Sequence, residues 1–361
     1  MKNFILFLVM CLFLNEAFSQ GCVAIRSNGS VCTVEHAMDD TTVKGWQLNS
    51  AYRYFKSFRH FRGNHEEPQR LIDNTEVINW QSTLDVTLIR QLNNRWSLSL
   101  GVPVIVNKRS SLYEHGRTER HNSSSKGIGD VRVIANRWML NPAKAAKGNF
   151  QFGLGVKFPT GNAGATDEFF NVGPDQTSQV RPVDQSIQPG DGGVGVVTEL
   201  NGYFSISSQL SAYSNLFYLI NPREQNGVRT FRETLSPRLA NEAIMSVPDQ
   251  YMARVGVNYA FENKWKPLSV AAGGRIEGIP VYDLIGGSDG FRRPGYVVSV
   301  EPAFNYQYKK FNFFAVVPVA LSRNRLQSIT DKESSVTTGT FVQGDAAFAD
   351  YVVNLGFTVK F

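Results

Sequence analysis

The chain has 361 residues, a net charge of +6 at pH 7 and a mean hydropathy of −0.22. Its basic residues are spread along the sequence without a Lys/Arg run, so the chain shows no sign of a nucleic-acid surface. Aromatic residues make up 12% of the chain and glycines number 31, which suits strands with one apolar and one polar face. Hydropathy alone would indicate a water-soluble protein, so the pattern along the chain has to decide.

The N-terminus has the layout of a secretory signal peptide. Lys2 supplies the positive charge, residues 4–14 form an apolar stretch too short to cross a bilayer, and Ala17-Phe18-Ser19 is a small-x-small cleavage site. We therefore expect residues 1–19 to be removed. The alternative is a lipoprotein cut before Cys22, but the preceding residues lack the branched apolar side chain that such a site requires.

Residues 20–45 form a short N-terminal segment that carries two cysteines. Cys11 leaves with the signal peptide, so Cys22 and Cys32 remain as an even pair in an oxidising compartment. We expect a disulfide; metal binding is the alternative, although no His or third thiol accompanies the pair. The segment is too short to be the plug of a TonB-dependent receptor, so energised import is not expected.

From residue 46 onward, apolar residues recur at every second position. Trp46, Leu48, Tyr52 and Tyr54 begin the series, and residues 78–88 follow with polar residues alone on the opposite face. Further strands are predicted at residues 96–106, 128–140, 150–158, 194–206, 210–220, 251–261, 268–281, 296–308 and 311–321. Together with the last strand, the count is about twelve.

The last strand has the clearest pattern in the chain. It is apolar at every second position from Tyr351 through Phe357 to Phe361, and small or polar between them. This is the pattern of an outer-membrane barrel strand, and the terminal aromatic resembles the signal read by the bacterial barrel assembly machinery. A soluble β domain with such an edge strand is the alternative. The sequence therefore predicts an all-β, transmembrane antiparallel up-and-down β-barrel over residues 46–361.

The connections alternate between short and long. Short links such as 93–94, 207–208 and 309–310 alternate with longer, polar links, among them 108–126, 161–190 and 221–248. Outer-membrane barrels have short periplasmic turns and long external loops, so both termini are predicted to be periplasmic. Loop 161–190 has the Pro, Asp and Gly content to fold inward as a constriction. An aromatic girdle is expected at the periplasmic rim, from Trp46, Trp96, Trp138 and Trp265.

If the apolar positions face lipid, a set of charged residues of both signs faces the lumen. Charges of opposite sign in a confined interior should pair, and they would either rigidify the barrel or line a narrow polar conduit. The predicted lumen residues are Arg53, Asp85, Asp130, Arg132, Lys157, Glu199, Arg254, Arg275, Glu277, Glu301 and Lys360.

Two short motifs lie at the predicted external rim. Gly127-Ile128-Gly129-Asp130 opens one strand and Phe158-Pro159-Thr160-Gly161-Asn162 closes the next, and both can shape the rim through bulges and bends. This Gly-x-Gly-Asp and Pro-Thr-Gly pair resembles the outer-membrane transporter family named after the phenol-degradation meta pathway (MetA-like), which is distantly FadL-like. The resemblance implies a barrel that transports small molecules. The chain shows no hydrophobic N-terminal hatch of the FadL kind.

A barrel enzyme is an alternative, because outer-membrane phospholipases have twelve strands and a His-x-Ser pair. His121-Asn122-Ser123 has that spacing, but the segment reads as a polar external loop and the Ser-Asn-Gly continuation is absent. The charged segments 66–67 and 114–120 are expected to bind lipopolysaccharide or cations, or to have no ligand.

The sequence therefore predicts an integral outer-membrane channel or transporter that passes a small solute passively through a narrow polar lumen. No cofactor, metal, nucleic acid or enzymatic activity is expected. The alternatives are a phospholipase-type barrel and a structural barrel of an envelope complex.

Overall fold

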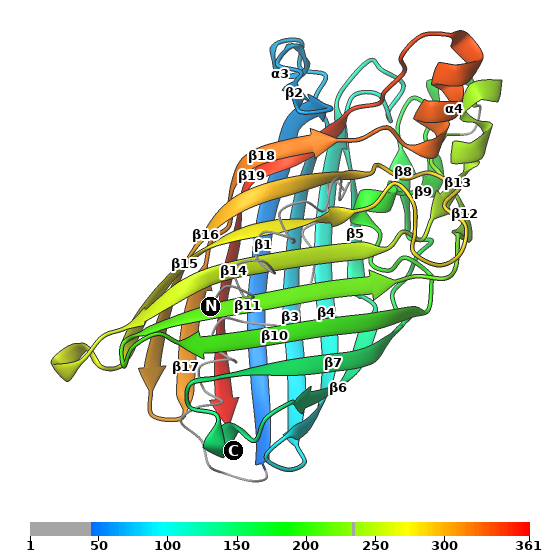
Figure 1. Cartoon of the computed structure of the whole chain (residues 1–361). Helices are drawn as coiled ribbons and strands as arrows, with labels where there is room; N and C mark the ends of the chain where they lie inside the picture. The colour runs from blue at the N-terminus through cyan, green and yellow to red at the C-terminus, as the bar shows by residue number, and fades with distance from the viewer. Residues whose placement is uncertain (1–44, 233–234) are drawn as a thin grey trace.

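The computed structural model describes residues 45–232 and 235–361, which form a closed antiparallel β-barrel of twelve strands (Figure 1). The predicted fold class is confirmed. The predicted signal peptide, residues 20–44 and the cysteines Cys22 and Cys32 lie outside the described residues.

Two of the twelve strands are interrupted and are counted with their continuations. In chain order the barrel strands are β1 (Gly45–Arg62), β3 (Ile78–Gln91), β4 (Trp96–Ser111), β5 (His121–Ile128) continued by β6 (Val131–Trp138), β7 (Gly148–Phe158), β10 (Gly195–Ser205), β11 (Leu210–Ile220), β14 (Gln250–Ala260), β15 (Leu268–Ile279), β16 (Gly295–Tyr308), β17 (Phe311–Val316) continued by β18 (Val319–Arg325), and β19 (Ala346–Lys360). Each strand pairs with its sequence neighbour.

The barrel closes where the last strand meets the first. β19 pairs antiparallel with β1 from Gln47 opposite Lys360 to Phe61 opposite Ala346. Beyond the last register pair, Trp46 and Phe361 exchange two backbone hydrogen bonds of 2.8 and 2.9 Å. No strand edge of the described wall is therefore left open at the seam, as a hydrocarbon environment requires.

Most of the smaller elements gather at one end of the barrel, called here the loop end; the opposite end, with the short turns and the C-terminus, is the turn end (Figure 1). The 3-10 helices Pro142–Lys144 and Asn263–Trp265 are in turns at the turn end. None of the helices in the described ranges is long and apolar enough to cross a membrane. The smaller elements are β2 (His65–Glu66), β8 (Thr166–Phe169), β9 (Gln179–Pro182), β12 (Gln225–Arg229), β13 (Ile244–Ser246), α3 (Gln69–Ile72), α4 (Ile329–Thr338), and 3-10 helices at Pro142–Lys144, Pro174–Gln176, Gln185–Ile187, Pro237–Ala243 and Asn263–Trp265.

The prediction of an external loop over residues 108–126 was wrong, because more than half of this stretch is strand. β4 continues to Ser111 and β5 starts at His121, so the connection is only 112–120. In β5 buried and exposed residues alternate, but the residues on both faces are polar: Ser123 and Ser125 are buried, and their neighbours are exposed. A search for apolar alternation misses such a strand. His121 and Ser123 consequently lie in β5 and not in a polar loop.

The two interruptions coincide with residues that weaken strand pairing. β5 gives way to β6 at Gly129 and Asp130, within the Gly-x-Gly-Asp motif that predicts a bend. β17 gives way to β18 at Val317 and Pro318, and Pro has no N–H for the ladder.

The outer surface of the strands is apolar and the inner positions are largely polar. Outward side chains such as Leu154 (52% exposed) and Val255 (63%) alternate with buried inward groups such as Arg254 (6%). In the closing strand Tyr351 and Phe361 are exposed, while Phe357 packs beside Phe311 and Phe313. Only an apolar solvent such as the interior of a bilayer suits so much exposed hydrocarbon around a closed barrel.

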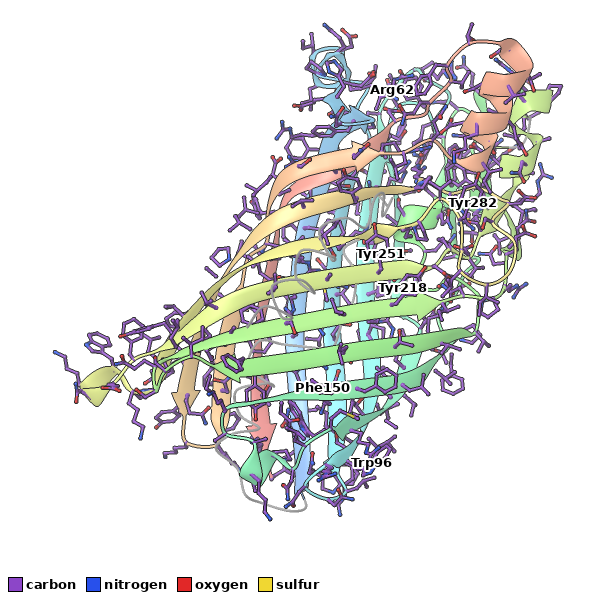
Figure 2. The ribbon with its side chains drawn as sticks, in the orientation of Figure 1. Arg62, Trp96, Phe150, Tyr218, Tyr251 and Tyr282 are labelled. Atoms are coloured by element: carbon purple, nitrogen blue, oxygen red, sulfur yellow. The ribbon has the colours of Figure 1, made fainter. Side chains whose placement is uncertain are left out.

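Part of the predicted aromatic girdle was placed wrongly. Trp46 and Trp96 are exposed at the turn end, where Figure 2 labels Trp96, and Trp265 is exposed in the turn after β14. Trp138 instead points inward and packs edge-on against Tyr203, with ring centroids 5.8 Å apart. The girdle therefore has three of the four predicted tryptophans.

Candidate functional site

Part of the long connection between β7 and β10 folds into the barrel. This lumen segment, residues 183–191, buries Val183 and Ile187 completely. Its backbone is held by inward side chains of three strands: Gln81 of β3 donates to Ser186 O (2.9 Å), and Asn107 of β4 (3.2 Å) and Ser125 of β5 donate to Ile187 O. The lumen segment therefore crosses the interior near the loop end.

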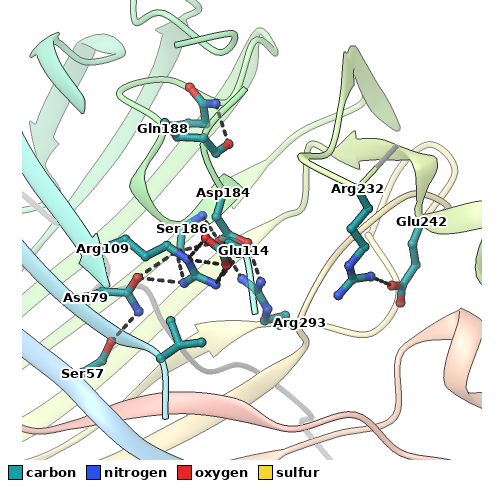
Figure 3. A network of polar contacts seen from close by, with 12 residues as sticks. Ser57, Asn79, Arg109, Glu114, Asp184, Ser186, Gln188, Arg232, Glu242 and Arg293 are labelled. Carbon is teal, nitrogen blue, oxygen red and sulfur yellow. Dashed lines mark hydrogen bonds and ion pairs between the residues drawn. The ribbon is translucent and has the colours of Figure 1, made fainter. Parts of the chain in front are cut away.

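An ion cluster fixes the lumen segment to the wall (Figure 3). Asp184, which is fully buried, accepts two hydrogen bonds from Arg293 (2.6 and 2.9 Å) and lies 3.4 Å from Arg109 of β4. Arg109 in turn donates to Glu114 (2.6 Å). Burial alone would raise the pKa of Asp184, but the two guanidinium groups hold it well below its usual range. Asp184 is therefore ionised at neutral pH.

The two sequence motifs meet at the base of the lumen segment. Asp130 accepts hydrogen bonds from the backbone N–H groups of Gly161 (3.0 Å) and Asp191 (3.1 Å). Thr160 Oγ1 donates to Gly129 O (2.8 Å) and accepts from the N–H of Val131 (2.9 Å). The Gly-x-Gly-Asp and Pro-Thr-Gly motifs thus clasp both ends of the inward connection at the break in the wall.

Glycine is required at the clasp because two backbones touch there. A Cβ on Gly190 would lie 2.5 Å from Gly161 O and 2.7 Å from Asp130 Oδ1, closer than side-chain atoms approach. Any larger residue at position 190 would push the lumen segment away from the clasp.

Below the lumen segment lies a partly open cavity of about 100 Å³, called here the roofed cavity. Inward side chains of successive strands surround it, and the loops before β14 and β16 complete the ring. The strand residues that line the cavity include Arg53 of β1, Thr83 of β3, Ile105 of β4, Arg132 of β6, Lys157 of β7, Gln250 of β14 and Ile279 of β15. A cavity of this size holds several water molecules or a small solute.

Above the roofed cavity, at the loop end, the structure has a wider vestibule of about 760 Å³. Arg70 and Arg117 lie over the ring of Tyr113 on its wall, at 5.3 and 5.4 Å. Arg109 and Arg293 also line it, and Arg293 lines the roofed cavity as well. The Asp184 cluster therefore stands between the two compartments.

The structure places nine of the eleven predicted lumen charges in the buried interior. Asp85 keeps 27% of its side chain exposed and pairs with Arg53 at 3.7 Å, and Lys360 is half-buried near the turn end. Their role as a pore lining stays a prediction. The buried nine are Arg53, Asp130, Arg132, Lys157, Glu199, Arg254, Arg275, Glu277 and Glu301.

Four of these charges form one network on β14, β15 and β16. Glu301, with no exposed surface, accepts from Arg254 (3.3 Å) and Arg275 (3.2 Å), and Arg275 also donates to Glu277 (2.6 Å). Lys157 pairs with Asp191 and, at 3.7 Å, with Asp130, so it ties β7 to the clasp.

The interior is less polar than the alternation predicts. Ile134, Val197, Phe217, Leu219 and Met252 form a fully buried inward cluster. A second cluster nearer the turn end contains Tyr213, Ala271, Ala303, Phe314 and Val316. The sequence contains a signal for both apolar clusters. Strand 210–220 carries apolar residues on both faces, so the apolar residues of one face must point into the lumen.

His121 and Ser123 do not form a catalytic pair in the structure. The His121 ring stacks on Phe170 with centroids 4.4 Å apart, and the buried Ser123 Oγ has no hydrogen-bond partner among the described residues. The charged segments predicted to bind lipopolysaccharide are paired internally: Glu66 with Arg59, Glu67 with Arg62, and Glu114 with Arg109.

Over most of its length the chain is similar to solved outer-membrane proteins. The COG4313 outer membrane channel from Pseudomonas putida F1 superposes with a TM-score of 0.57 at 12% identity, covering 89% of this chain and 97% of that chain. A FadL homologue from Pseudomonas aeruginosa gives 0.42 at 10% identity, covering 88% and 90%. The Pseudomonas putida toluene transporter TodX gives 0.41 at 7% identity, covering 95% and 96%.

No known family profile matches the sequence. No curated protein sequence matches it either. The likeness to the COG4313 channel shows a shared fold. The resemblance to the phenol-degradation meta-pathway family, drawn from the two motifs, therefore stays a prediction.

Proposed function

We propose that this protein is a passive channel in the bacterial outer membrane, which admits a small solute at the loop end and restricts its passage at the lumen segment. The observation that carries the proposal is the sequence of compartments along the barrel: the vestibule, the Asp184 cluster and the roofed cavity, with Arg293 on the walls of both spaces. A barrel that served only as an anchor would need no such series of spaces.

The presence of water inside the lumen is supported by buried polar side-chain atoms that have no hydrogen-bond partner among the described residues. Inward Asn49 Oδ1 on β1, Asn136 Oδ1 on β6, Arg254 Nε on β14, Asn312 Nδ2 on β17 and Thr358 Oγ1 on β19 have no partner among the described residues. Buried polar groups are rarely left unsatisfied, and water satisfies those that the protein does not. Such atoms occur around the whole wall, which fits a hydrated interior.

Location in the outer membrane is supported by the apolar outer wall, the closed seam and the secretory N-terminus. With both barrel termini at the turn end, the turn end would face the periplasm and the loop end the exterior. Lipopolysaccharide would then surround the loop end, and the barrel assembly machinery would insert the chain.

Single-channel recording tests the proposal. Purified full-length protein in a planar bilayer should give discrete current steps in KCl, smaller than those of wide porins, because the lumen segment narrows the path. Insertion without any current steps would overturn the channel proposal.

A structural barrel is the second candidate, because the Tyr213 cluster fills part of the lumen near the turn end. The same recording separates the two. A stably folded, inserted barrel that never conducts would favour the structural role.

A further inference from the structure

We infer that a groove on the outer wall near the loop end binds an acyl chain of lipid A, the membrane anchor of lipopolysaccharide, and that Lys332 binds a phosphate of the same lipid. The inference rests on the proposed orientation, in which the loop end faces the exterior.

The groove lies on the outward face of four neighbouring strands. It has a volume of about 660 Å³, and sites for small molecules generally have volumes of roughly 300–1,000 Å³. We call it the tyrosine groove, and Figure 2 labels its three tyrosines near the loop end of these strands. Its large side chains are Phe152 of β7, Leu200 of β10, Leu216 and Tyr218 of β11, Tyr251 of β14, and Tyr282 of the connection after β15.

The strand register explains why the wall is hollow at this place. One row of residues in register crosses the four strands and ends on the methyl group of Ala253; the row is Phe152, Leu200, Leu216 and Ala253. In the next row toward the loop end, Tyr218 lies opposite Tyr251, which in turn lies opposite Gly278 of β15. Small residues beside large aromatic ones leave a depression in the wall.

The lining of the groove suits an acyl chain. Phe152 and Leu216 expose their apolar side chains there, and the rings of Tyr218 and Tyr251 stack with centroids 6.3 Å apart. A chain that lies in a depression contacts protein atoms on more sides than a chain on a flat wall, so it gains more dispersion contacts. The tyrosine groove should therefore retain one lipid chain in preference to the rest of the wall.

A cation lies at the loop-end rim of the groove. Lys332 of α4 donates to the hydroxyl of Tyr282 (3.3 Å), and its ammonium lies 4.6 Å from the centroid of that ring. Lys332 forms no ion pair with a carboxylate within the described parts of the chain. Since an ammonium has three donors, the bond to Tyr282 leaves donors for a phosphate.

The combination of an apolar groove and a cation at its rim identifies the kind of lipid. Basic side chains at the membrane surface attract anionic head groups, while the apolar groove requires an acyl chain. In the proposed orientation, the surrounding leaflet consists mainly of lipopolysaccharide. Its lipid A carries phosphate groups close to its acyl chains, so one molecule can occupy both parts of the site.

Binding is measured on the full-length protein in detergent, with diphosphoryl lipid A as the probe. A titration followed by native mass spectrometry should give a Kd for the first lipid bound. Ala253→Trp fills the hollow and should abolish this first binding. Lys332→Gln should raise the Kd by roughly fivefold, because one Lys near an anionic lipid surface contributes about 1 kcal/mol.

Each variant has a matched control. Val257→Trp adds the same ring on the outward face of β14 but outside the groove, and Lys264→Gln removes a Lys that lies 5.7 Å from the Trp265 ring centroid in the turn after β14. Both controls should bind lipid A as the wild type does, and heat-modifiable migration verifies the fold of each protein. No binding by the wild type, an unchanged Kd in Lys332→Gln, or equally tight binding of phosphatidylglycerol would overturn the inference.

Photo-cross-linking in intact cells tests the site in its membrane. A benzoylphenylalanine in place of Tyr282 should cross-link to lipopolysaccharide, whereas one in place of Tyr308, exposed at the end of β16, should not. The opposite result would reverse the orientation and overturn the inference. Lipid A binding by a barrel that carries no current would overturn the channel proposal and keep the lipid site, and current without lipid A binding would do the reverse.

Discussion

Asp184 and Arg293 lie 109 residues apart in sequence, yet they form a two-bond ion pair of 2.6 and 2.9 Å inside the barrel. The neighbouring Arg292 pairs with Asp283 instead, with bonds of 2.6 and 3.0 Å. Two adjacent arginines of the connection before β16 thus have different roles: Arg292 pairs within its own connection, and Arg293 joins it to the lumen segment. The Arg293–Asp184 pair holds the lumen segment inside the barrel.

The charge of Asp184 should be required for the narrow state of the lumen. Asp184→Asn keeps the side-chain size but removes the anion between Arg109 and Arg293, and breaking a buried ion pair from one side costs about 3–5 kcal/mol. We expect the lumen segment to leave its position and the single-channel conductance to increase. Asp175→Asn, exposed in the same connection, should conduct as the wild type does. Equal conductance in all three proteins would show that the lumen segment is not the constriction.

The Glu301 network should contribute strongly to barrel stability. Glu301→Gln leaves Arg254 and Arg275 without their shared anion in a buried site, so we expect a loss of about 3–5 kcal/mol in the free energy of unfolding. Urea unfolding followed by the mobility of unboiled samples on a gel measures this loss. Glu262→Gln, in an exposed turn, should be neutral. A loss of similar size in both variants would contradict the assignment.

Strand positions could be predicted from the sequence where both faces follow a simple rule. Strand 78–88 and strand 210–220 were found almost to their ends, because the alternation is a local property of the chain. The strand character of residues 108–111 and 121–126 could not be found this way, since neither face there is apolar. The inward course of the lumen segment also depends on partners far away, such as Arg293 for Asp184. Such pairings follow from the register between distant strands, which no single stretch of sequence contains.

Acidification should loosen the cluster around His115, in the connection between β4 and β5. Burial, followed by electrostatic repulsion from the His121 side chain, lowers the pKa of His115 to about 4; Asp167 opposes this shift and Arg109 adds to it. Since the unfolded group titrates near 6.5, its neutral form contributes stability that is complete above about pH 6.5 and is lost as the pH falls toward 4.

Hydrogen exchange provides the measurement for His115. The Phe170 N–H donates to His115 Nδ1 at 3.1 Å, so its exchange, corrected for the intrinsic pH dependence, should accelerate between pH 6.5 and 4. His115→Gln removes the titrating group and should remove most of that acceleration. The same pH dependence in the variant would assign the effect to another group.

The last residue should be needed for assembly. Phe361 exchanges two backbone hydrogen bonds with Trp46, at 2.8 and 2.9 Å, and its side chain is 63% exposed at the outward face of the turn end. Deleting Phe361 removes both bonds at the seam and the terminal aromatic, whereas Phe361→Asp keeps the backbone bonds and removes only the aromatic. If the seam decides assembly, the deletion alone should reduce the heat-modifiable, folded form in outer-membrane fractions. If the terminal aromatic is the signal read by the assembly machinery, as we expect, both changes should reduce it, and Phe361→Tyr should restore it. Wild-type amounts of folded barrel in both the deletion and the Asp variant would refute a role for this residue.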